Sequence, residues 1–114
     1  MALTIKMLAD GQIGPNPNTV YDLNSSTGVP DGKAWIVKNM RFCNTDKVAQ
    51  TLNLCYVRSG STPRQISAKD LSVAPGAMFI DDQELTLGAG DKLQAKTSPG
   101  SKFDYVISGV ERDA

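Results

Sequence analysis

Apolar and polar residues alternate along most of the chain, in short segments separated by turn residues. The clearest alternation lies in residues 33–58, where even positions carry the apolar side chains of Ala34, Ile36, Met40, Phe42, Leu52, Leu54 and Tyr56. Alternation with a period of two indicates half-buried β-strands. The Asn-Thr-Asp-Lys break between the two segments has turn chemistry. We therefore predict a central antiparallel hairpin, in which Phe42 lies opposite Tyr56 and Cys43 lies opposite Cys55.

Two groups of apolar residues fall outside this alternating row and are our candidate interface. Leu3, Ile5 and Met7 alternate before the break at residues 9–11, and so predict a short first strand that pairs in its own sheet or lies across a neighbouring subunit. Trp35 and Val37 form a second apolar patch on the odd face of the hairpin. This patch indicates contact with another subunit or with the N-terminal arm. The alternative is a strand end that is buried on both faces.

Turn residues divide the remaining chain at intervals of roughly 8–12 residues. Further strands are predicted at residues 19–23, 64–74 with a bend near 69–70, 78–80, 85–87, 92–97 and 102–111. Residues 14–18 and 24–32 are predicted to be loops, the latter exposed, because Pro, Gly, Asn and Ser dominate them. About eight short strands without a convincing helix predict an all-β fold. We expect residues 1–114 to form one domain, a single antiparallel β-sandwich of jelly-roll type.

Pro-Gly pairs at residues 75–76 and 99–100 predict tight turns. Pairing across the second turn would join residues 92–97 and 102–111 in a hairpin. The expected pairs are mixed, because Leu93 would face Val106 whereas Lys96 would face Phe103. The pattern therefore leaves open which face of this C-terminal hairpin is buried.

Composition removes several function classes. The 12 basic and 12 acidic residues balance, so the chain has no basic stripe of the kind that binds nucleic acid. Histidine, the commonest general base and metal ligand, is absent. No apolar run reaches the about 20 residues that a membrane span needs. The N-terminus resembles no signal peptide, so we expect synthesis in a cytoplasm.

Three short segments carry residues that could form a site of chemistry, and all are better explained as turns. Asp81, Asp82 and Glu84 lack the spacing of a calcium loop. Residues 88–91 lack the glycine spacing and following helix of a phosphate cradle. Residues 59–61 contain serines with no histidine to activate them. Paired acids for glycoside cleavage stay open, because carboxylate separation depends on the fold. We predict no catalytic residues, no metal and no cofactor.

The two cysteines are predicted to be reduced structural thiols in a cytoplasm. In the predicted hairpin Cys43 and Cys55 are cross-strand neighbours, so oxidation to a disulfide outside the cell stays open. Two cysteines without histidine give no zinc-binding pattern.

Six stretches follow one another along the chain: KMLADGQI, TVYDL, KAWIVKNMRFCNTD, VAQTLNLCYVRSGS, AGDKLQAKTS and FDYVISGVE. In this order they resemble small bacteriophage virion proteins of the β-sandwich type, which are like capsid decoration (cement) proteins. Together the stretches cover about residues 3–111, and the order of turns and strands carries the resemblance. The chain departs from this pattern in its longer loop at 24–32 and in its two cysteines.

The resemblance implies a non-enzymatic protein of the virion, made in the host bacterial cytoplasm. The leading hypothesis is a capsid decoration protein that binds across major-capsid subunits, and a homo-oligomer is expected because exposed edge strands must be covered. The alternative is a neck, tail or fibre-base component, since such proteins occupy several places in a particle. A second alternative is a carbohydrate-binding module with Trp35, Tyr21 or Tyr56 as sugar platforms. No nucleic-acid or membrane partner is expected.

Overall fold

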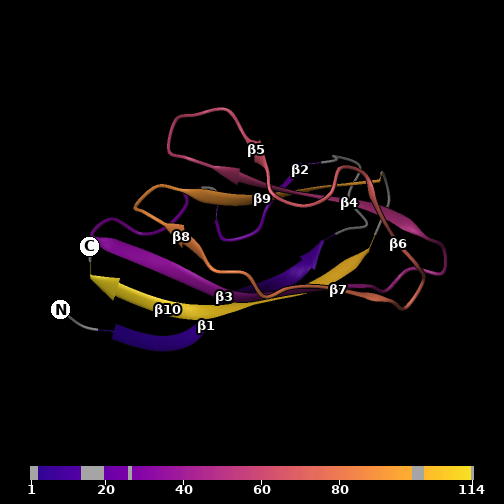
Figure 1. The fold of residues 1–114 in the computed structure, drawn as a ribbon, viewed down its shortest axis with the longest axis horizontal. Helices are drawn as coiled ribbons and strands as arrows, with labels where there is room; N and C mark the ends of the chain where they lie inside the picture. Colours follow the sequence, from indigo (N-terminus) through magenta and orange to yellow (C-terminus); the bar gives the residue numbers. More distant parts are fainter. Residues whose placement is uncertain (1–2, 14–19, 26, 99–101, 114) are drawn as a thin grey trace.

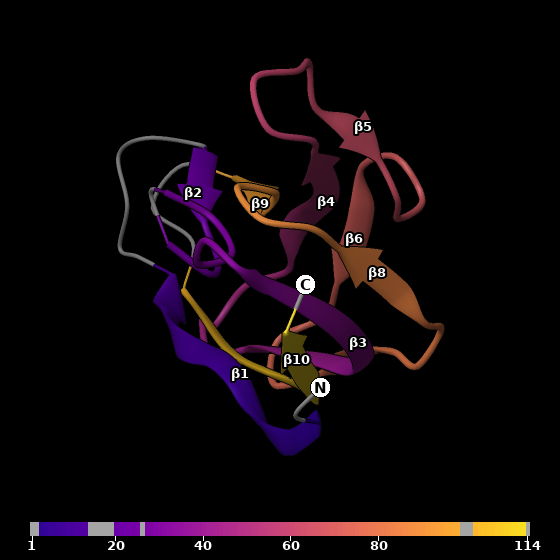
Figure 2. The same cartoon turned by 90° about the vertical axis from the view of Figure 1, so that its left-hand side faces the viewer.

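The computed structural model describes residues 3–13, 20–25, 27–98 and 102–113, without the side chains of Leu3 and Val20. These residues form two antiparallel five-stranded sheets that pack face to face (Figures 1 and 2). The strands are β1 (Leu3–Ile13), β2 (Val20–Asp22), β3 (Lys33–Asn44), β4 (Gln50–Val57), β5 (Arg64–Gln65), β6 (Leu71–Val73), β7 (Met78–Asp81), β8 (Leu85–Leu87), β9 (Lys92–Thr97) and β10 (Phe103–Asp113). The predicted all-β sandwich is confirmed.

The strand order is that of a jelly roll. Sheet A runs β1-β10-β3-β7, with β8 also on β3, and sheet B runs β2-β9-β4-β5, with β6 also on β4. Because β5 and β6 share one neighbour, and β7 and β8 share another, ten strands fill the eight strand positions of two interleaved Greek keys. The chain therefore changes sheet at most of its connections, as the two layers in Figure 1 show.

The predicted central hairpin is wrong. β3 lies in sheet A and β4 in sheet B, so residues 45–49 connect the two layers rather than two neighbouring strands. Phe42 pairs with Tyr105 and Phe79, whereas Tyr56 pairs with Leu93 and Arg64. Met40 and Phe42 do face the same core as Leu52 and Leu54, but from opposite sheets, whereas Ile36 of the predicted row points away from the core. Alternation reports which side is buried, and this property is the same for a hairpin and for two strands facing each other across a sandwich.

The C-terminal hairpin is wrong for the same reason. β9 pairs with β2 and β4 in sheet B, and β10 pairs with β1 and β3 in sheet A. The mixed register expected between Leu93 and Val106 therefore never forms. Leu93 is buried in the core, while Val106 is on the outside of the opposite sheet. The predicted turn at 99–100 and the predicted loop at 14–18 lie outside the described residues.

The core lies between the inner faces of the two sheets. Its largest fully buried side chains come from both, and they include Phe42, Phe103, Ile13, Met40, Leu52, Leu54, Leu87 and Leu93. The Phe42 and Tyr105 rings stack with centroids 5.8 Å apart. Burial of a large apolar side chain contributes about 1.5–3 kcal/mol. This shared core is what holds sheet A against sheet B.

The first strand is longer than predicted. β1 continues through residues 9–11, where the alternation breaks, because Leu8 forms a bulge between Met7 and Ala9 and turns into the core. A 12-residue strand such as β3 spans about 40 Å at a rise of about 3.3 Å per residue. The long strands β1, β3 and β10 therefore set the elongated shape, whose extents are 45 × 26 × 21 Å.

Several predicted turns are confirmed by hydrogen bonds. The Ala77 amide donates to Ala74 with Gly76 at φ +71°, as a type II turn requires, and the Asp91 amide donates to Gly88 in the same way. The bend expected near Lys69-Asp70 separates β5 from β6. No helix long and apolar enough to cross a membrane occurs in the described part of the chain.

Candidate assembly surface

The outer face of sheet A, which the core does not use, exposes several apolar side chains among polar ones. β10 alternates regularly, so Asp104, Val106, Ser108 and Val110 point away from sheet B while Phe103, Tyr105 and Ile107 are buried. One row across the strands is Ile5, Val110 and Ile36. A second row is Asp10, Val106, Arg41 and Ile80. We call this surface the outer face of sheet A.

Most of the exposed large apolar side chains gather on this one face. Six such side chains occur in the described residues, and Val48, in the β3–β4 connection, is the one elsewhere. The other five are Ile5 (87% exposed), Met7 (52%), Met78 (55%), Ile80 (54%) and Val106 (37%). Single exposed apolar residues need no explanation, but a group on one sheet face marks an interaction surface. These five residues define the candidate assembly surface.

Two bulges at the same level of sheet A determine which residues reach this surface. Leu8 is the extra residue of β1, and Lys38 is the extra residue of β3; both lie beside Ser108 of β10. Each bulge reverses the alternation along its strand. Ile36 and Arg41 consequently share the outer face despite their different parity. Gly109 permits the arrangement, because a Cβ at this position would collide with the carbonyl oxygen of Ile36.

The residues predicted to form an interface divide into two groups. Ile5 and Met7 lie exposed on β1, which is an edge of sheet A, while the side chain of Leu3 is not described. Trp35 and Val37 instead lie on the inner face, and both are buried. Their burial matches the alternative of a strand end buried on both sides, since Ala34 is also buried. The bulge at Lys38 is the reason, because it moves odd positions of β3 into the core.

Trp35 is further tied to the inner face by its polar atom. Its Nε1 donates to Glu111 Oε2 at 2.9 Å, and Lys6 Nζ lies 3.1 Å from the other oxygen of that carboxylate. The hydrogen bonds from Trp35 and Lys6 hold the pKa of Glu111 below its usual value. Trp35 is therefore not available as a sugar platform. Tyr21 is half-buried against Tyr105, with ring centroids 6.2 Å apart.

Sequence reasoning missed Met78, Ile80 and Val106 as surface residues. Residues 78–80 were expected to form a strand, but Met, Phe and Ile are all apolar and give no sign of which side is inner. The structure places Phe79 against Phe42 and leaves its two neighbours outside. The signal in the sequence is the run of three apolar residues at 78–80. Such a strand has apolar side chains on both of its sides, so one side is exposed if the strand lies away from the centre of the sheet.

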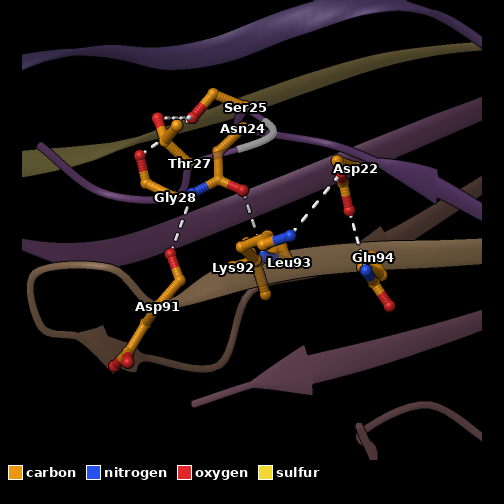
Figure 3. Close-up of polar contacts among 9 residues, drawn as sticks. All are labelled: Asp22, Asn24, Ser25, Thr27, Gly28, Asp91, Lys92, Leu93 and Gln94. Atoms are coloured by element: carbon orange, nitrogen blue, oxygen red, sulfur yellow. Dashed lines mark hydrogen bonds and ion pairs between the residues drawn. The ribbon is translucent and has the colours of Figure 1, made fainter. Parts of the chain in front are cut away.

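Sheet B differs, because its outer face is polar and hydrogen-bonded to itself. Gln94 Nε2 donates to Asp22 Oδ1 at 2.7 Å, and Lys92 Nζ lies 3.7 Å from Asp22 Oδ2 (Figure 3). Farther across the sheet, Gln65 Nε2 donates to Asn53 Oδ1 at 2.8 Å. Cross-strand polar pairs of this kind suit a solvated face. The outer faces of the two sheets are thus chemically distinct.

Asn24, Gly28 and Val29 are held against the start of β9, so the prediction of an exposed loop at 24–32 is wrong in part. Asn24 donates to the Asp91 carbonyl and accepts from the Leu93 amide, both at 3.2 Å (Figure 3). Val29 also donates to the Asp91 carbonyl at 3.0 Å and is buried. Gly28 has φ +82°, and a Cβ there would lie 2.6 Å from the Asp91 carbonyl oxygen. The contacts with Asp91 and Leu93 therefore hold the described part of the connection between β2 and β3 against sheet B.

Asp91 is a buried carboxylate with a structural set of partners. Oδ1 accepts from the Ser59 amide at 3.0 Å, and Oδ2 accepts from Tyr56 Oη and from the Gly88 amide, both at 2.9 Å. Burial alone would raise the pKa of Asp91, but these three hydrogen bonds and the charge of Arg58 outweigh it and lower the pKa. With both oxygens occupied, Asp91 closes the turn at 88–91 rather than serving as a free acid.

The remaining candidate chemistry is also structural. Asp81 Oδ1 accepts from the Gln83 amide at 3.0 Å, and Glu84 forms an ion pair with Lys38 at 2.9 Å, so this acidic segment is a turn between β7 and β8. No group of three or more potential metal ligands is found in the described residues. Cys43 and Cys55 are free and lie on the outer sides of different sheets, so the open possibility of a disulfide between them is wrong.

Comparison with known proteins identifies the fold. No family model matches the sequence, and a search of curated proteins finds no match. The chain is similar to part of a chain in the infectious bursal disease virus particle, with TM-score 0.64 and 10% identity over 97% of this chain and 31% of that one. The Gx strain of the same virus gives TM-score 0.53 and 12% identity over 99% of this chain and 32% of that one.

A third similar structure matches at full length. A chain in the acid-stable capsid of the Helicobacter pylori bacteriophage KHP30 gives TM-score 0.54 and 15% identity, over 99% of this chain and 98% of that chain. The present chain therefore spans less than a third of the infectious bursal disease virus chains but nearly all of the KHP30 chain. These likenesses show that the jelly-roll sandwich described above is a fold found in viral particles.

Proposed function

We propose that the protein is a non-enzymatic structural component of a viral particle, namely a capsid decoration (cement) protein of a bacteriophage. The observation that carries this proposal is the outer face of sheet A, which holds five of the six exposed large apolar side chains of the described residues. The fold similarity to chains of two viral particles, one of them of the same length, supports it. The expected partner is the major capsid protein, across the joints between its subunits.

The physical basis is apolar burial repeated over many copies. Covering a large side chain such as Ile5 or Ile80 contributes up to about 1.5–3 kcal/mol. Much of that gain is spent on ordering the two partners, so a single copy would bind weakly. Copies that contact one another on a shell act together and bind far more tightly. The balanced formal charge of the chain, +0 at pH 7, limits repulsion between such closely spaced copies.

An edge of sheet A gives a reason to expect a homo-oligomer. β1 pairs with β10 on one side, and no strand of the described residues pairs with its other side. Thr4, Ile5, Lys6 and Met7 are all exposed along this edge. A long open edge carrying apolar side chains is normally covered by another chain. Sedimentation at micromolar concentration is expected to show a closed oligomer, and a chain that stays monomeric both free and on the particle would contradict this part of the proposal.

Copy number tests the place of the protein in the particle. We would purify particles of the virus that encodes this chain and measure the ratio of this protein to the major capsid protein by quantitative mass spectrometry. A decoration role predicts hundreds of copies per particle. Six or twelve copies would instead assign it to a neck, tail or fibre base, the alternative that the same fold serves equally well. Absence from purified particles would overturn the proposal of a structural role.

A further inference from the structure

A polar pocket lies at the far end of sheet B from the β3–β4 connection, under the loop that joins β4 to β5. Its volume is about 540 Å³, and it is lined by Tyr56, Arg58, Gly60, Ser61, Thr62 and Arg64. The loop rises above the two layers beside β5 in Figure 1. None of these residues except Tyr56 takes part in the polar network around Asp91 by a hydrogen bond of its side chain. Because Tyr56 and Arg64 lie on strands of sheet B, the pocket is separate from the outer face of sheet A.

The backbone explains why two arginines and a tyrosine meet here. Tyr56 pairs directly with Arg64 across β4 and β5, so their side chains lie on the same face of sheet B. Arg58 follows Tyr56 by two positions and continues on that side. The Ser61 amide donates to the Arg58 carbonyl at 2.8 Å, with Gly60 at φ +74°, so the loop turns back on itself. That turn brings the two hydroxyl residues beside the arginines.

Neither arginine side chain in the pocket is engaged by the described part of the chain. Arg58 and Arg64 form no ion pair there and their guanidinium groups form no hydrogen bond, although the charge of Arg58 lowers the pKa of Asp91. Two guanidinium groups therefore keep their donors for something outside the chain. A guanidinium binds a carboxylate or a phosphate through two parallel hydrogen bonds. The pocket volume lies in the range of about 300–1,000 Å³ that is usual for small-molecule sites.

We propose that this pocket binds an acidic sugar, with Arg58 and Arg64 holding the acid group, Ser61 and Thr62 meeting the sugar hydroxyls, and Tyr56 lining the wall. The hydroxyl side chains and the aromatic ring favour a sugar over an acidic peptide, because a sugar offers hydroxyl groups and an apolar C–H face together. The acid is a carboxylate, as in a uronic acid, or a phosphate ester. The proposal does not depend on a role in a viral particle, and it adds recognition of an acidic glycan to whatever the outer face of sheet A binds.

Titration of the isotope-labelled full chain, followed by NMR, tests the site. Glucuronic acid and glucose 6-phosphate are expected to shift the resonances of residues 56–64 saturably, and glucose is expected to shift them at least tenfold more weakly. The Arg58→Gln and Arg64→Gln variants are each expected to weaken glucuronic acid binding at least tenfold. Lys47→Gln, which removes one exposed positive charge from the β3–β4 connection, is the matched control and is expected to bind as the unmodified protein does.

Several results would overturn the proposal. Glucuronic acid binding that survives both arginine substitutions, or no saturable shift with either acidic sugar, would remove the site. Equal binding of glucose would show that charge recognition is wrong. Inorganic phosphate or a glutamate-rich peptide binding as tightly as glucuronic acid would show that the sugar is wrong. Thermal unfolding of each variant is measured in parallel, and a retained midpoint assigns lost binding to the pocket rather than to misfolding.

Discussion

The two outer faces of the sandwich differ far more than the two inner faces do. Inside, both sheets present the same kind of closely packed apolar row. Outside, sheet B carries amides and charges that bind one another, as Gln94 does with Asp22. Sheet A instead leaves Ile5, Ile80 and Val106 exposed to solvent among polar side chains such as Arg41. The comparison teaches that the fold needs only the inner rows, so the composition of each outer face reports what that face meets.

The largest effects are expected where the two sheets are alike. Phe42 of sheet A and Leu54 of sheet B are both fully buried. Phe42→Ala is expected to lower the free energy of unfolding by about 3–5 kcal/mol, and Leu54→Ala by about 2–5 kcal/mol, because each leaves a cavity. Chemical denaturation measures both. An unchanged midpoint for either variant would show that the corresponding sheet does not depend on the shared core.

The next largest effects are expected from two glycine substitutions, which separate the cost of steric crowding from the cost of a left-handed backbone conformation. Gly28 and Gly32 have similar φ values, +82° and +76°, but only Gly28 is crowded, by the carbonyls of Asp91 and Gly90. Gly32→Ala is expected to cost about 1–2 kcal/mol for the left-handed conformation alone. Gly28→Ala adds about 1–3 kcal/mol for the forced contact. Equal losses in thermal unfolding would mean that Gly28 is not held against the start of β9.

Asp91, beside the start of β9, is expected to make the free energy of unfolding depend on pH. Its folded-state pKa is lowered, so ionised Asp91 stabilises the protein fully above the unfolded carboxyl pKa of about 3.9, and that contribution is lost as the pH falls through the lower folded pKa. Asp91→Asn is expected to cost about 1–3 kcal/mol at neutral pH, because buried donors lose an acceptor. The variant should also lose less stability on acidification. Parallel stability curves for the two proteins between pH 2 and 7 would contradict this account.

The sequence predicted the layers better than their connections. Alternation along residues 33–42 and 52–56 correctly identified two core strands, and with the turn spacing it predicted the sandwich. It could not tell that β3 and β4 face each other across the core instead of pairing side by side, because both arrangements bury the same residues. Nothing local encodes the choice, which is made by partners such as β10 from the far end of the chain.

The residues of the candidate assembly surface could be predicted only where alternation in the sequence distinguished the two sides of a strand. Ile5 and Met7 were identified because they alternate in an N-terminal segment. Trp35 and Val37 were misplaced because the bulge at Lys38 reverses the alternation within β3, and a bulge leaves little trace in a sequence. The acidic-sugar pocket had no linear signal either, since it depends on the pairing of Tyr56 with Arg64.

Lysine substitutions on the two outer faces test the difference between sheet A and sheet B most directly, and they are expected to have the smallest effect on stability. Ile5→Lys with Ile80→Lys places two charges on the outer face of sheet A, and Ser72→Lys places one on the exposed side of β6 in sheet B. Exposed substitutions of this kind usually change the free energy of unfolding by less than about 0.5 kcal/mol. Co-sedimentation with shells assembled without this protein is the decisive measurement. We predict that the sheet A variant no longer binds the shells while the Ser72→Lys variant binds as the unmodified protein does; equal binding by the two variants, or loss of binding only through sheet B, would contradict the account.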